Sequence, residues 1–459
     1  MEIITATEMK ELDRRTIESG TGSSELMERA GMGFVRILER ELGNLKRRKI
    51  LIFAGKGNNG GDGLVVARQL KKMGCRVTVV LLAEKRDMTG DCLLNFRRAK
   101  KLSVKFMNGL TCPPHALCEE ISGAAVIVDA IFGTGFQGDM KGTLRAVTAM
   151  INDSPKPVVS CDIPSGVNGD TGAVGTGGAV RADLTITFAY PKRGLFSPPG
   201  NAFAGNIRVA DIGIRKTEEK GKTARLCLLT NDGIKCLLMK RKKNVYKNNF
   251  GHILVLAGSP GMTGAATLVC EAAARSGAGL VTLAIPESLN GILATKLTEA
   301  MTLPLEETGA QTLSLRSFES IVKFVKKRKV SAVAMGPGFS SNPETASLVR
   351  KLVSALELPC VLDADALNAF VSCLAELKRA GKRLIITPHE GEFSRLSGIA
   401  KSVIEKDRIN RAKSFASENG LVCVLKGYQT VVSDGKNTFI NTTGNPGMAT
   451  GGAGDVLTG

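Results

Sequence analysis

The sequence predicts an α/β protein with two domains, and three observations lead to this prediction. Short apolar runs alternate with helical segments, a pattern typical of βαβ units and parallel sheets. Glycine-rich segments directly follow several of the apolar runs. The chain has 459 residues, which is more than one ordinary domain needs. We expect domains at residues 1–214 and 225–459, because the charged segment between them has no apolar period.

The first domain opens with helical segments at 8–19 and 25–31. Five apolar runs follow that read as strands, at 50–54, 76–82, 125–131, 157–162 and 183–189. Helical segments separate these runs, so we expect a Rossmann-like, doubly wound fold of three layers. Its ligand should lie at the carboxyl ends of the strands.

The second domain repeats the α/β pattern. The predicted strands are 252–258, 280–285, 330–335, 359–363, 383–387 and 421–425. The short runs 431–433 and 438–441 flank Asp434-Gly435, which predicts a β-hairpin.

A glycine cluster, residues 55–63, lies between the predicted strand 50–54 and a predicted helix at 64–70. Strand, glycine turn and helix together are the layout of a dinucleotide site. The cluster does not end in Gly-Lys-Ser/Thr, so it is not a P-loop, and no clear ribose-binding acid follows it. Asn58 and Asn59 are unusual in a plain turn. Their amide oxygens can coordinate a hard cation, and their N–H₂ groups can bind phosphate or ribose.

Two further strand ends of the first domain carry Asp129 and the pair Asp162 and Ser165. All three strand ends should converge on one edge of the sheet. An aspartate in such a place is often only a helix N-cap. The set of carboxylate, amide and hydroxyl nevertheless suits a monovalent or hard divalent cation. Asp162 should then be free to transfer a proton.

The second domain ends in Thr450-Gly451-Gly452-Ala453-Gly454-Asp455. Glycine-rich backbone can turn its N–H groups toward an anion, and a helix that begins at about Asp455 favours phosphate. Asp455 would lie beside that anion as a base. His389 follows a strand end together with two acids. A lone histidine is usually a structural hydrogen-bonding group, but this setting favours a substrate contact.

Composition narrows the class of protein. The formal net charge is +19, with basic runs at 240–243 and 326–329. These runs lack interleaved aromatic residues, so we favour a solvated face or attraction of anionic nucleotides over nucleic-acid binding. The eleven cysteines include no C-x-x-C pair, which is typical of reduced thiols in a cytoplasm. The amino terminus does not read as a signal peptide, and no apolar run reaches the roughly 18 residues of a membrane span.

The first domain resembles the NAD(P)H-hydrate epimerase family. The resemblance rests on Asn58–Asp62, on Asp129 with Phe132-Gly133-Thr134-Gly135, and on Asp162-Ile163-Pro164-Ser165-Gly166; the helix at 26–31 also matches. It implies exchange between the R and S forms of hydrated NADH and NADPH, with Asp162 as the acid or base. The implied potassium ligands are Asn59, Asp129 and Ser165. The implied substrate contacts are Asn58, Asn59, Gly60, Gly61, Asp62, Gly133, Thr134, Gly135, Phe136, Gln137, Gly138, Asp139 and Asp162.

The second domain resembles the ADP- or ATP-dependent NAD(P)H-hydrate dehydratase family, which has a ribokinase-like fold. The resemblance implies that ATP or ADP, with magnesium, phosphorylates the C6 hydroxyl of the S hydrate, and that phosphate then leaves. Asp455 would be the base. The implied hydrate contacts are Ala265, Gly338, His389 and Asp455. The implied nucleotide contacts are Lys426, Gly427, Tyr428, Gln429, Thr430 and Gly454.

Together the two resemblances predict a bifunctional enzyme that repairs hydrated nicotinamide nucleotides, an isomerase and a lyase in one chain. We expect a cytoplasmic homo-oligomer. A ribokinase-like domain normally continues beyond the Gly-Asp pair, so the second domain is expected to lack its carboxyl end here. Two alternatives remain open from the residues: a kinase for a vitamin or sugar, and a module that binds nucleotide or protein without catalysis.

Overall fold

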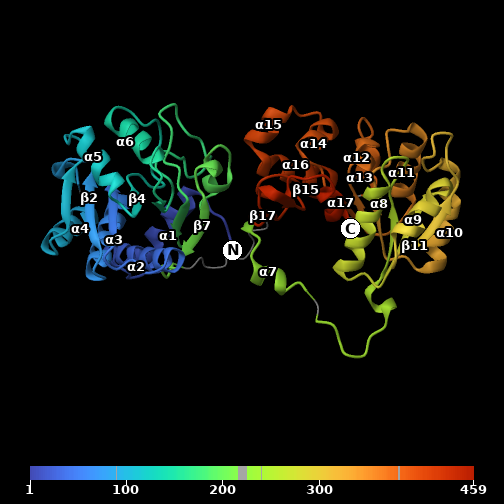
Figure 1. Ribbon diagram of the computed structural model, residues 1–459, viewed down its shortest axis with the longest axis horizontal. Helices are drawn as coiled ribbons and strands as arrows, with labels where there is room; N and C mark the ends of the chain where they lie inside the picture. The colour runs from blue at the N-terminus through green and yellow to red at the C-terminus, as the bar shows by residue number, and fades with distance from the viewer. Residues whose placement is uncertain (89, 215–224, 239, 381–382) are drawn as a thin grey trace. The chain divides into compact units, whose positions relative to one another are not determined.

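The computed structural model describes residues 1–88, 90–214, 225–238, 240–380 and 383–459 (Figure 1). The chain divides into two compact units: an N-terminal unit, Glu2–Lys222, and a C-terminal unit, Thr223–Gly459 together with Met1. The charged segment that we expected to separate two domains, residues 215–222, lies outside the described residues. Each unit contains its own sheet.

The N-terminal unit has a seven-stranded parallel sheet in the order β3-β2-β1-β4-β5-β6-β7. The five predicted strands are present, and β3 and β7 are additional edge strands. The strands are β1 (Lys49–Ala54), β2 (Arg76–Leu81), β3 (Lys105–Asn108), β4 (Val126–Ala130), β5 (Val158–Cys161), β6 (Leu184–Phe188) and β7 (Asn206–Ala210).

Helices cover both faces of this sheet, and the side chains of the inner strand β1 alternate between the two faces. Ile50 and Ile52 of β1 belong to the core shared with α2, α3 and α4, whereas Leu51 and Phe53 face the core shared with α5 and α6. All four of these side chains are fully buried. The helices are α1 (Ala6–Glu18), α2 (Ser23–Leu42), α3 (Asn58–Lys72), α4 (Gly90–Lys101), α5 (Pro114–Ser122) and α6 (Thr143–Asn152). The predicted three-layer fold is confirmed.

The C-terminal unit has a ten-stranded sheet in the order β11-β10-β9-β12-β13-β14-β15-β16-β17-β8. Strands β9 to β15 are parallel, and β15, β16 and β17 are antiparallel, which confirms the predicted hairpin. The strands are β8 (Leu226–Leu228), β9 (His252–Leu256), β10 (Leu280–Pro286), β11 (Met301–Leu305), β12 (Ala332–Met335), β13 (Cys360–Leu362), β14 (Leu384–Ile386), β15 (Val422–Leu425), β16 (Thr430–Ser433) and β17 (Thr438–Asn441).

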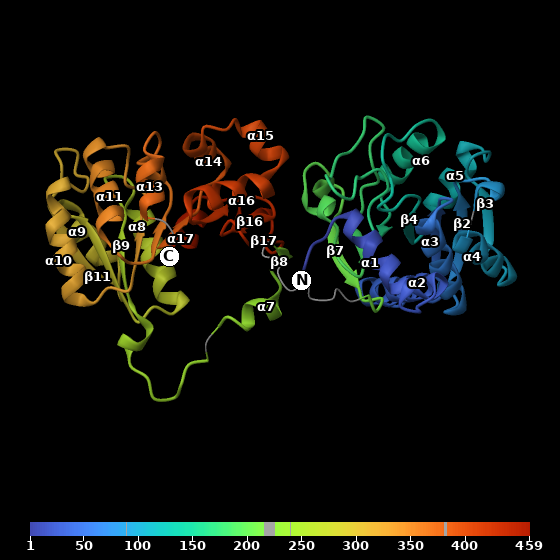
Figure 2. The ribbon, with the colours of Figure 1, turned by 180° about the vertical axis from the view of Figure 1, so that it is seen from behind.

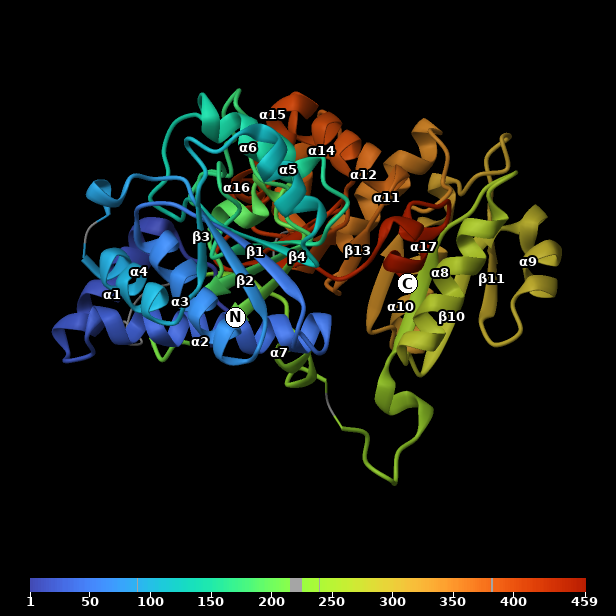
Figure 3. The ribbon, with the colours of Figure 1, turned by 60° about the vertical axis from the view of Figure 1, so that its left-hand side comes forward.

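Helices α14, α15 and α16 gather near the β15–β17 end of this sheet (Figure 2). The last helix, α17, packs against α8, where Gly459 approaches Val269 and Ala272 (Figure 3). The helices are α7 (Asn231–Lys235), α8 (Thr263–Ser276), α9 (Asn290–Lys296), α10 (Phe318–Arg328), α11 (Pro343–Ala355), α12 (Asp365–Asn368), α13 (Leu374–Ala380), α14 (Glu390–Ser397), α15 (Lys401–Lys406), α16 (Arg408–Asn419) and α17 (Ala453–Thr458). None of the described helices combines the length and apolar character needed to cross a bilayer.

Two helix starts differ from the sequence prediction. Helix α3 begins at Asn58 and not at Leu64, so Asn58–Asp62 is helical rather than part of a turn. Glycine makes this early start possible, because a Cβ at Gly60 would overlap the carbonyl oxygen of Gly55 and one at Gly63 would clash with the Cβ of Ala130. Helix α17 begins at Ala453, two residues before the expected Asp455.

Candidate functional site

The carboxyl ends of β1, β4 and β5 are neighbours in the N-terminal sheet, and they bring Asn59, Asp129 and Ser165 together around Phe132. Asn59 Nδ2 donates to the Phe132 carbonyl at 2.8 Å. Ser165 Oγ accepts from the Phe132 amide at 2.8 Å and donates to Asp129 Oδ1 at 2.5 Å. These are the three residues that the sequence assigned to a cation.

Asp129 is fully buried and heavily hydrogen-bonded. Its Oδ2 accepts from Ser160 Oγ at 2.8 Å and from the Ser165 amide at 2.9 Å. Burial raises the pKa of Asp129, although the hydrogen bonds from Ser165 and Ser160 act in the opposite direction. Asn59 Oδ1 is also buried and has no hydrogen-bond partner among the described residues. An orphaned amide oxygen beside a buried carboxylate fits a hard cation.

Asp162, just beyond β5, is not the free carboxylate that the sequence suggested. Its Oδ1 forms an ion pair with Lys192 Nζ and accepts from Thr187 Oγ1 at 3.0 Å. Lys192 is only 1% exposed, and its ammonium also donates to Thr187 Oγ1 at 3.1 Å and to the Phe188 carbonyl at 2.9 Å. The φ angle of Asp162 is +63°, an uncommon conformation for aspartate that the surrounding structure must enforce. Lys192 therefore fixes the position of Asp162.

Two further carboxyl groups share the electrostatic environment of this pair. Burial raises the pKa of Asp62 well above its usual range, and the carboxylates of Asp162 and Asp13 raise it further. Burial also raises the pKa of Asp13 to about 6, with Lys192 acting in the opposite direction. With a pKa of about 6, Asp13 can exchange a proton near neutral pH.

The amino-terminal arm, residues 3–5, leads into α1 and so places Asp13 near the ion pair of Asp162 and Lys192. Ile4 forms a parallel bridge with Lys192. Its amide donates to the Pro191 carbonyl at 3.0 Å, and its carbonyl accepts from the Arg193 amide at 2.9 Å. The arm thereby braces the backbone that carries Lys192.

The loop 133–139, predicted to contact substrate, follows β4. Asp139 accepts from Thr176 Oγ1 at 2.6 Å and from the Gly177 amide at 2.5 Å. These bonds lower the pKa of Asp139. The Asp139 carboxylate thus ties this loop to the neighbouring loop 175–178.

In the C-terminal unit, a buried carboxylate connects the predicted nucleotide residues. Asp363 Oδ1 accepts from Lys426 Nζ at 2.7 Å and from Thr387 Oγ1 at 2.8 Å. Its Oδ2 accepts from Thr458 Oγ1 of α17 at 2.9 Å. A Cβ at Gly454 would lie 3.5 Å from Lys426 Nζ, so Gly454 and Lys426 are adjacent.

Asp455 lies in the first turn of α17, in the same environment. Burial raises its pKa, and the charge of Asp363 raises it further, while Lys426 acts in the opposite direction. A carboxylate with a raised pKa is a better base than an exposed one.

A buried arginine shapes the turn 426–430. Arg408 donates to the Tyr428 carbonyl and, through Nη2, to the carbonyls of Leu425 at 3.1 Å and Lys426 at 3.0 Å. Its Nε lies 3.3 Å from Glu390 Oε1. Arg408 therefore connects the backbone of this turn to the start of α16 and, through Glu390, to α14.

The remaining predicted residues fall into two places. A Cβ at Gly338, whose φ is +68°, would lie 3.3 Å from the Cβ of Ala265, so these two positions are neighbours. His389 caps α14, because its Nδ1 accepts from the amides of Gly391 at 3.0 Å and Glu392 at 3.4 Å. If the ring is neutral, this cap puts its proton on Nε2. The contact between His389 and substrate stays a prediction.

Comparison with known proteins relates both units to one family. Residues 23–194 match the family described as YjeF-related protein N-terminus, and residues 253–459 match NAD(P)H-hydrate dehydratase. A bifunctional NAD(P)H-hydrate repair enzyme of Moorella thermoacetica is 43% identical over 465 residues, covering 100% of this chain and 87% of that enzyme. The chain belongs to the bifunctional NAD(P)H-hydrate repair enzymes.

Other members of the repair-enzyme family are similar along the whole chain. The enzyme of Thermofilum pendens is 37% identical, covering 100% of this chain and 86% of that enzyme. Among solved structures, an ADP/ATP-dependent NAD(P)H-hydrate dehydratase of Bacillus subtilis, crystallised with ATP and Mg²⁺, is 30% identical. That match covers 50% of this chain and 78% of the other, with a TM-score of 0.42.

Sequence reasoning missed three residues of these repair-enzyme sites. Lys192 stands three residues past the predicted strand 183–189, at the edge where Asp162 was expected, and this position was the available signal. Asp13 lies in an ordinary amphipathic helix, so only the fold reveals its neighbours. Arg408 also belongs to no sequence motif, because it donates hydrogen bonds to backbone carbonyls.

Proposed function

We propose that this chain repairs hydrated NADH and NADPH at two sites. The N-terminal unit interconverts the R and S hydrates. The C-terminal unit dehydrates the S hydrate with ATP or ADP. The observation that carries the proposal is the presence, in one chain of this family, of two carboxylate sites, each at the carboxyl edge of its own sheet.

In the N-terminal unit, inversion at C6 needs a proton delivered to the leaving oxygen and recovered when oxygen returns. Asp162, which Lys192 holds in place, is positioned as one of the groups that transfer this proton. The carboxyl groups of Asp62 and Asp13 can hold the proton nearby. Loop 133–139 and the start of α3 would bind the rest of the substrate.

Asn59, Asp129 and Ser165 would hold a potassium ion, whose positive charge would fix the substrate-binding backbone around Phe132. The unpartnered Asn59 Oδ1 and the buried Asp129 carboxylate support this assignment.

In the C-terminal unit, Asp455 takes the proton of the C6 hydroxyl, whose oxygen then attacks the terminal phosphorus of the nucleotide. A new O–P bond forms while the bond from that phosphorus to the rest of the nucleotide breaks, so the nucleotide leaves one phosphate shorter. The original C6–O bond then breaks, with phosphate as the leaving group. Loss of the C5 proton restores the ring double bond. Lys426 and Gly454 would contact the nucleotide phosphates, and Gly427, Tyr428, Gln429 and Thr430 the rest of it.

The test uses purified S and R hydrates. With ATP or ADP and magnesium, the absorbance of NADH should return from both epimers, and without nucleotide only R-to-S exchange should occur. Replacing potassium by a larger organic cation should slow exchange. Asp129→Ala should be slow in both buffers. Equal exchange rates for wild type in the two buffers would contradict the potassium site but leave the repair function standing. The homo-oligomeric state and cytoplasmic location stay predictions.

A further inference from the structure

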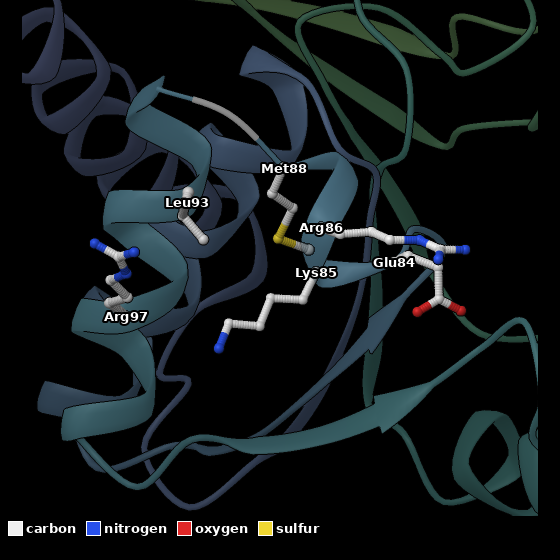
Figure 4. A pocket seen from close by; sticks show the side chains of 6 residues that line it. All are labelled: Glu84, Lys85, Arg86, Met88, Leu93 and Arg97. Carbon is white, nitrogen blue, oxygen red and sulfur yellow. The ribbon is translucent and has the colours of Figure 1, made fainter.

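A hollow of about 580 Å³ lies beside the N-terminal site, between the short helix η1 (Lys85–Asp87) and α4. Glu84, Lys85, Arg86 and Met88 line it from the β2 side, and Leu93 and Arg97 line it from α4. In Figure 4, Lys85 extends from η1 toward α4, and Arg97 stands on that helix, while Glu84 and Arg86 lie at the other end. The volume is in the range of small-molecule sites.

The hollow is basic, because three cationic side chains and only one carboxylate line it. Within the described part of the chain, no carboxylate forms an ion pair with Lys85, Arg86 or Arg97. Met88 and Leu93 add apolar surface between them. Cations beside an apolar wall suit a phosphate attached to a flat ring system.

The sheet puts this hollow next to the glycine segment. The Leu82 amide donates to the Ala54 carbonyl at 2.9 Å, and Gly55 follows Ala54, so the end of β2 lies about one strand spacing from that segment. Glu84 follows Leu82 by two residues. Cys92 of α4 also approaches the Gly55 carbonyl, at 3.8 Å. In sheets of the order found here, the adenosine ribose of a dinucleotide lies at the end of β2. An acid there binds the 2′-hydroxyl, or a nearby cation binds a 2′-phosphate. Glu84 is the acid that sequence reasoning did not find.

We propose that this hollow binds the adenosine end of the hydrated dinucleotide, with Glu84 on the ribose and Lys85 and Arg97 on the 2′-phosphate of hydrated NADPH. This inference rests on the proposed epimerase function. It assigns the discrimination between the two substrates to residues far from the reacting carbon.

The experiment compares KM for R-to-S exchange of hydrated NADPH and hydrated NADH, using the whole chain. Arg97→Ala and Lys85→Ala should each raise KM for hydrated NADPH about tenfold, the loss expected for one charge-assisted contact, and change KM for hydrated NADH less than about twofold. Glu84→Gln should act in the reverse sense, raising KM for hydrated NADH only. The matched control is Arg98→Ala, because Arg98 is the next residue on α4 and does not line the hollow.

Equal changes of KM for both substrates in Arg97→Ala and Lys85→Ala would overturn the proposal. A wild-type chain that exchanges neither hydrate would instead contradict the proposed function. A second arm distinguishes substrate from free nucleotide. Adenosine 2′,5′-bisphosphate should compete with hydrated NADPH and bind at least about fivefold more weakly to Arg97→Ala, whereas binding without competition would place a separate nucleotide site here and overturn the assignment.

Discussion

A buried lysine governs the chemistry expected of Asp162. The ammonium of Lys192 spends its three donors on Asp162, Thr187 and the Phe188 carbonyl, and almost none of the side chain reaches solvent. We therefore expect Lys192 to act as a positioning residue through Asp162, and its removal would leave a partly buried carboxylate without its cation.

Lys192→Met should reduce kcat for R-to-S exchange by about 10²-fold with KM nearly unchanged, because Asp162 loses its fixed geometry but the substrate contacts remain. Steady-state kinetics with each hydrate measure this split. Arg68→Met is the matched control: Arg68 is also buried and forms an ion pair with Glu28 in the same unit. The control should lower stability without lowering kcat. Equal loss of kcat in both variants would mean that Lys192 is merely structural.

Ionisation of Asp13 is expected to lower the stability of the folded state, which is unusual for an aspartate. Its pKa of about 6 lies above the usual 3.8, so the folded state binds its proton more tightly than the unfolded state. Ionisation of Asp13 thus costs stability, and this cost appears as pH rises from about 4 to about 6. Asp13→Asn should stabilise the N-terminal unit by about 1–2 kcal/mol at pH 8, a value reduced for the partial exposure of Asp13.

The measurement is calorimetric unfolding of wild type and Asp13→Asn at pH 3.5 and pH 8. At pH 3.5 Asp13 is protonated in the folded state and mostly protonated in the unfolded state, so the gain in stability should nearly vanish. An equal gain in stability at both pH values would show that the shape of the asparagine side chain, and not the loss of the Asp13 charge, explains the gain.

At the scale of elements, the glycines at the start of α3 decide how closely the helix approaches β1 and β4. Gly60→Ala should destabilise the N-terminal unit by about 1–3 kcal/mol, because the new methyl group meets backbone that cannot move aside. Gly57→Ala is the control in the same segment, since a Cβ there has no neighbour within 4 Å. Chemical denaturation followed by circular dichroism compares them. A similar cost for both substitutions would contradict the packing argument.

The sequence predicted central elements better than edges, for a physical reason. Strands such as β1 and β4 are buried on both faces and read as continuous apolar runs. The missed strands β3, β7, β8 and β11 lie at sheet edges and are partly exposed, so Lys105–Asn108 or Met301–Leu305 gives no such run. Site residues were predicted where they stand at strand ends. Lys192 and Arg408 were missed because ion pairs and carbonyl contacts follow from the fold.

At the scale of the whole molecule, each unit carries its own sheet and its own carboxylate site. The two reactions should therefore be separable. Asp455→Asn should abolish nucleotide-dependent dehydration and leave R-to-S exchange within about twofold of wild type, because the amide keeps the shape but cannot accept the proton. Asp162→Asn should slow exchange by roughly 10²–10⁴-fold and leave dehydration of the S hydrate intact.

Mixing the two variants provides the check on this separation. Together they should restore repair of the R hydrate, since each supplies the activity that the other lacks. If Asp455→Asn still dehydrates the S hydrate at near wild-type rate, Asp455 is not the base.

The bridge between Ile4 and Lys192 has a practical consequence for anyone handling this protein. The short amino-terminal arm, residues 3–5, holds in place the peptide that carries a buried ammonium. Trimming the arm, or crowding it with an affinity tag, would disturb the backbone around Lys192 and remove the Thr5 cap of α1. Preparations that fold well but exchange hydrates poorly should be examined first at their amino terminus.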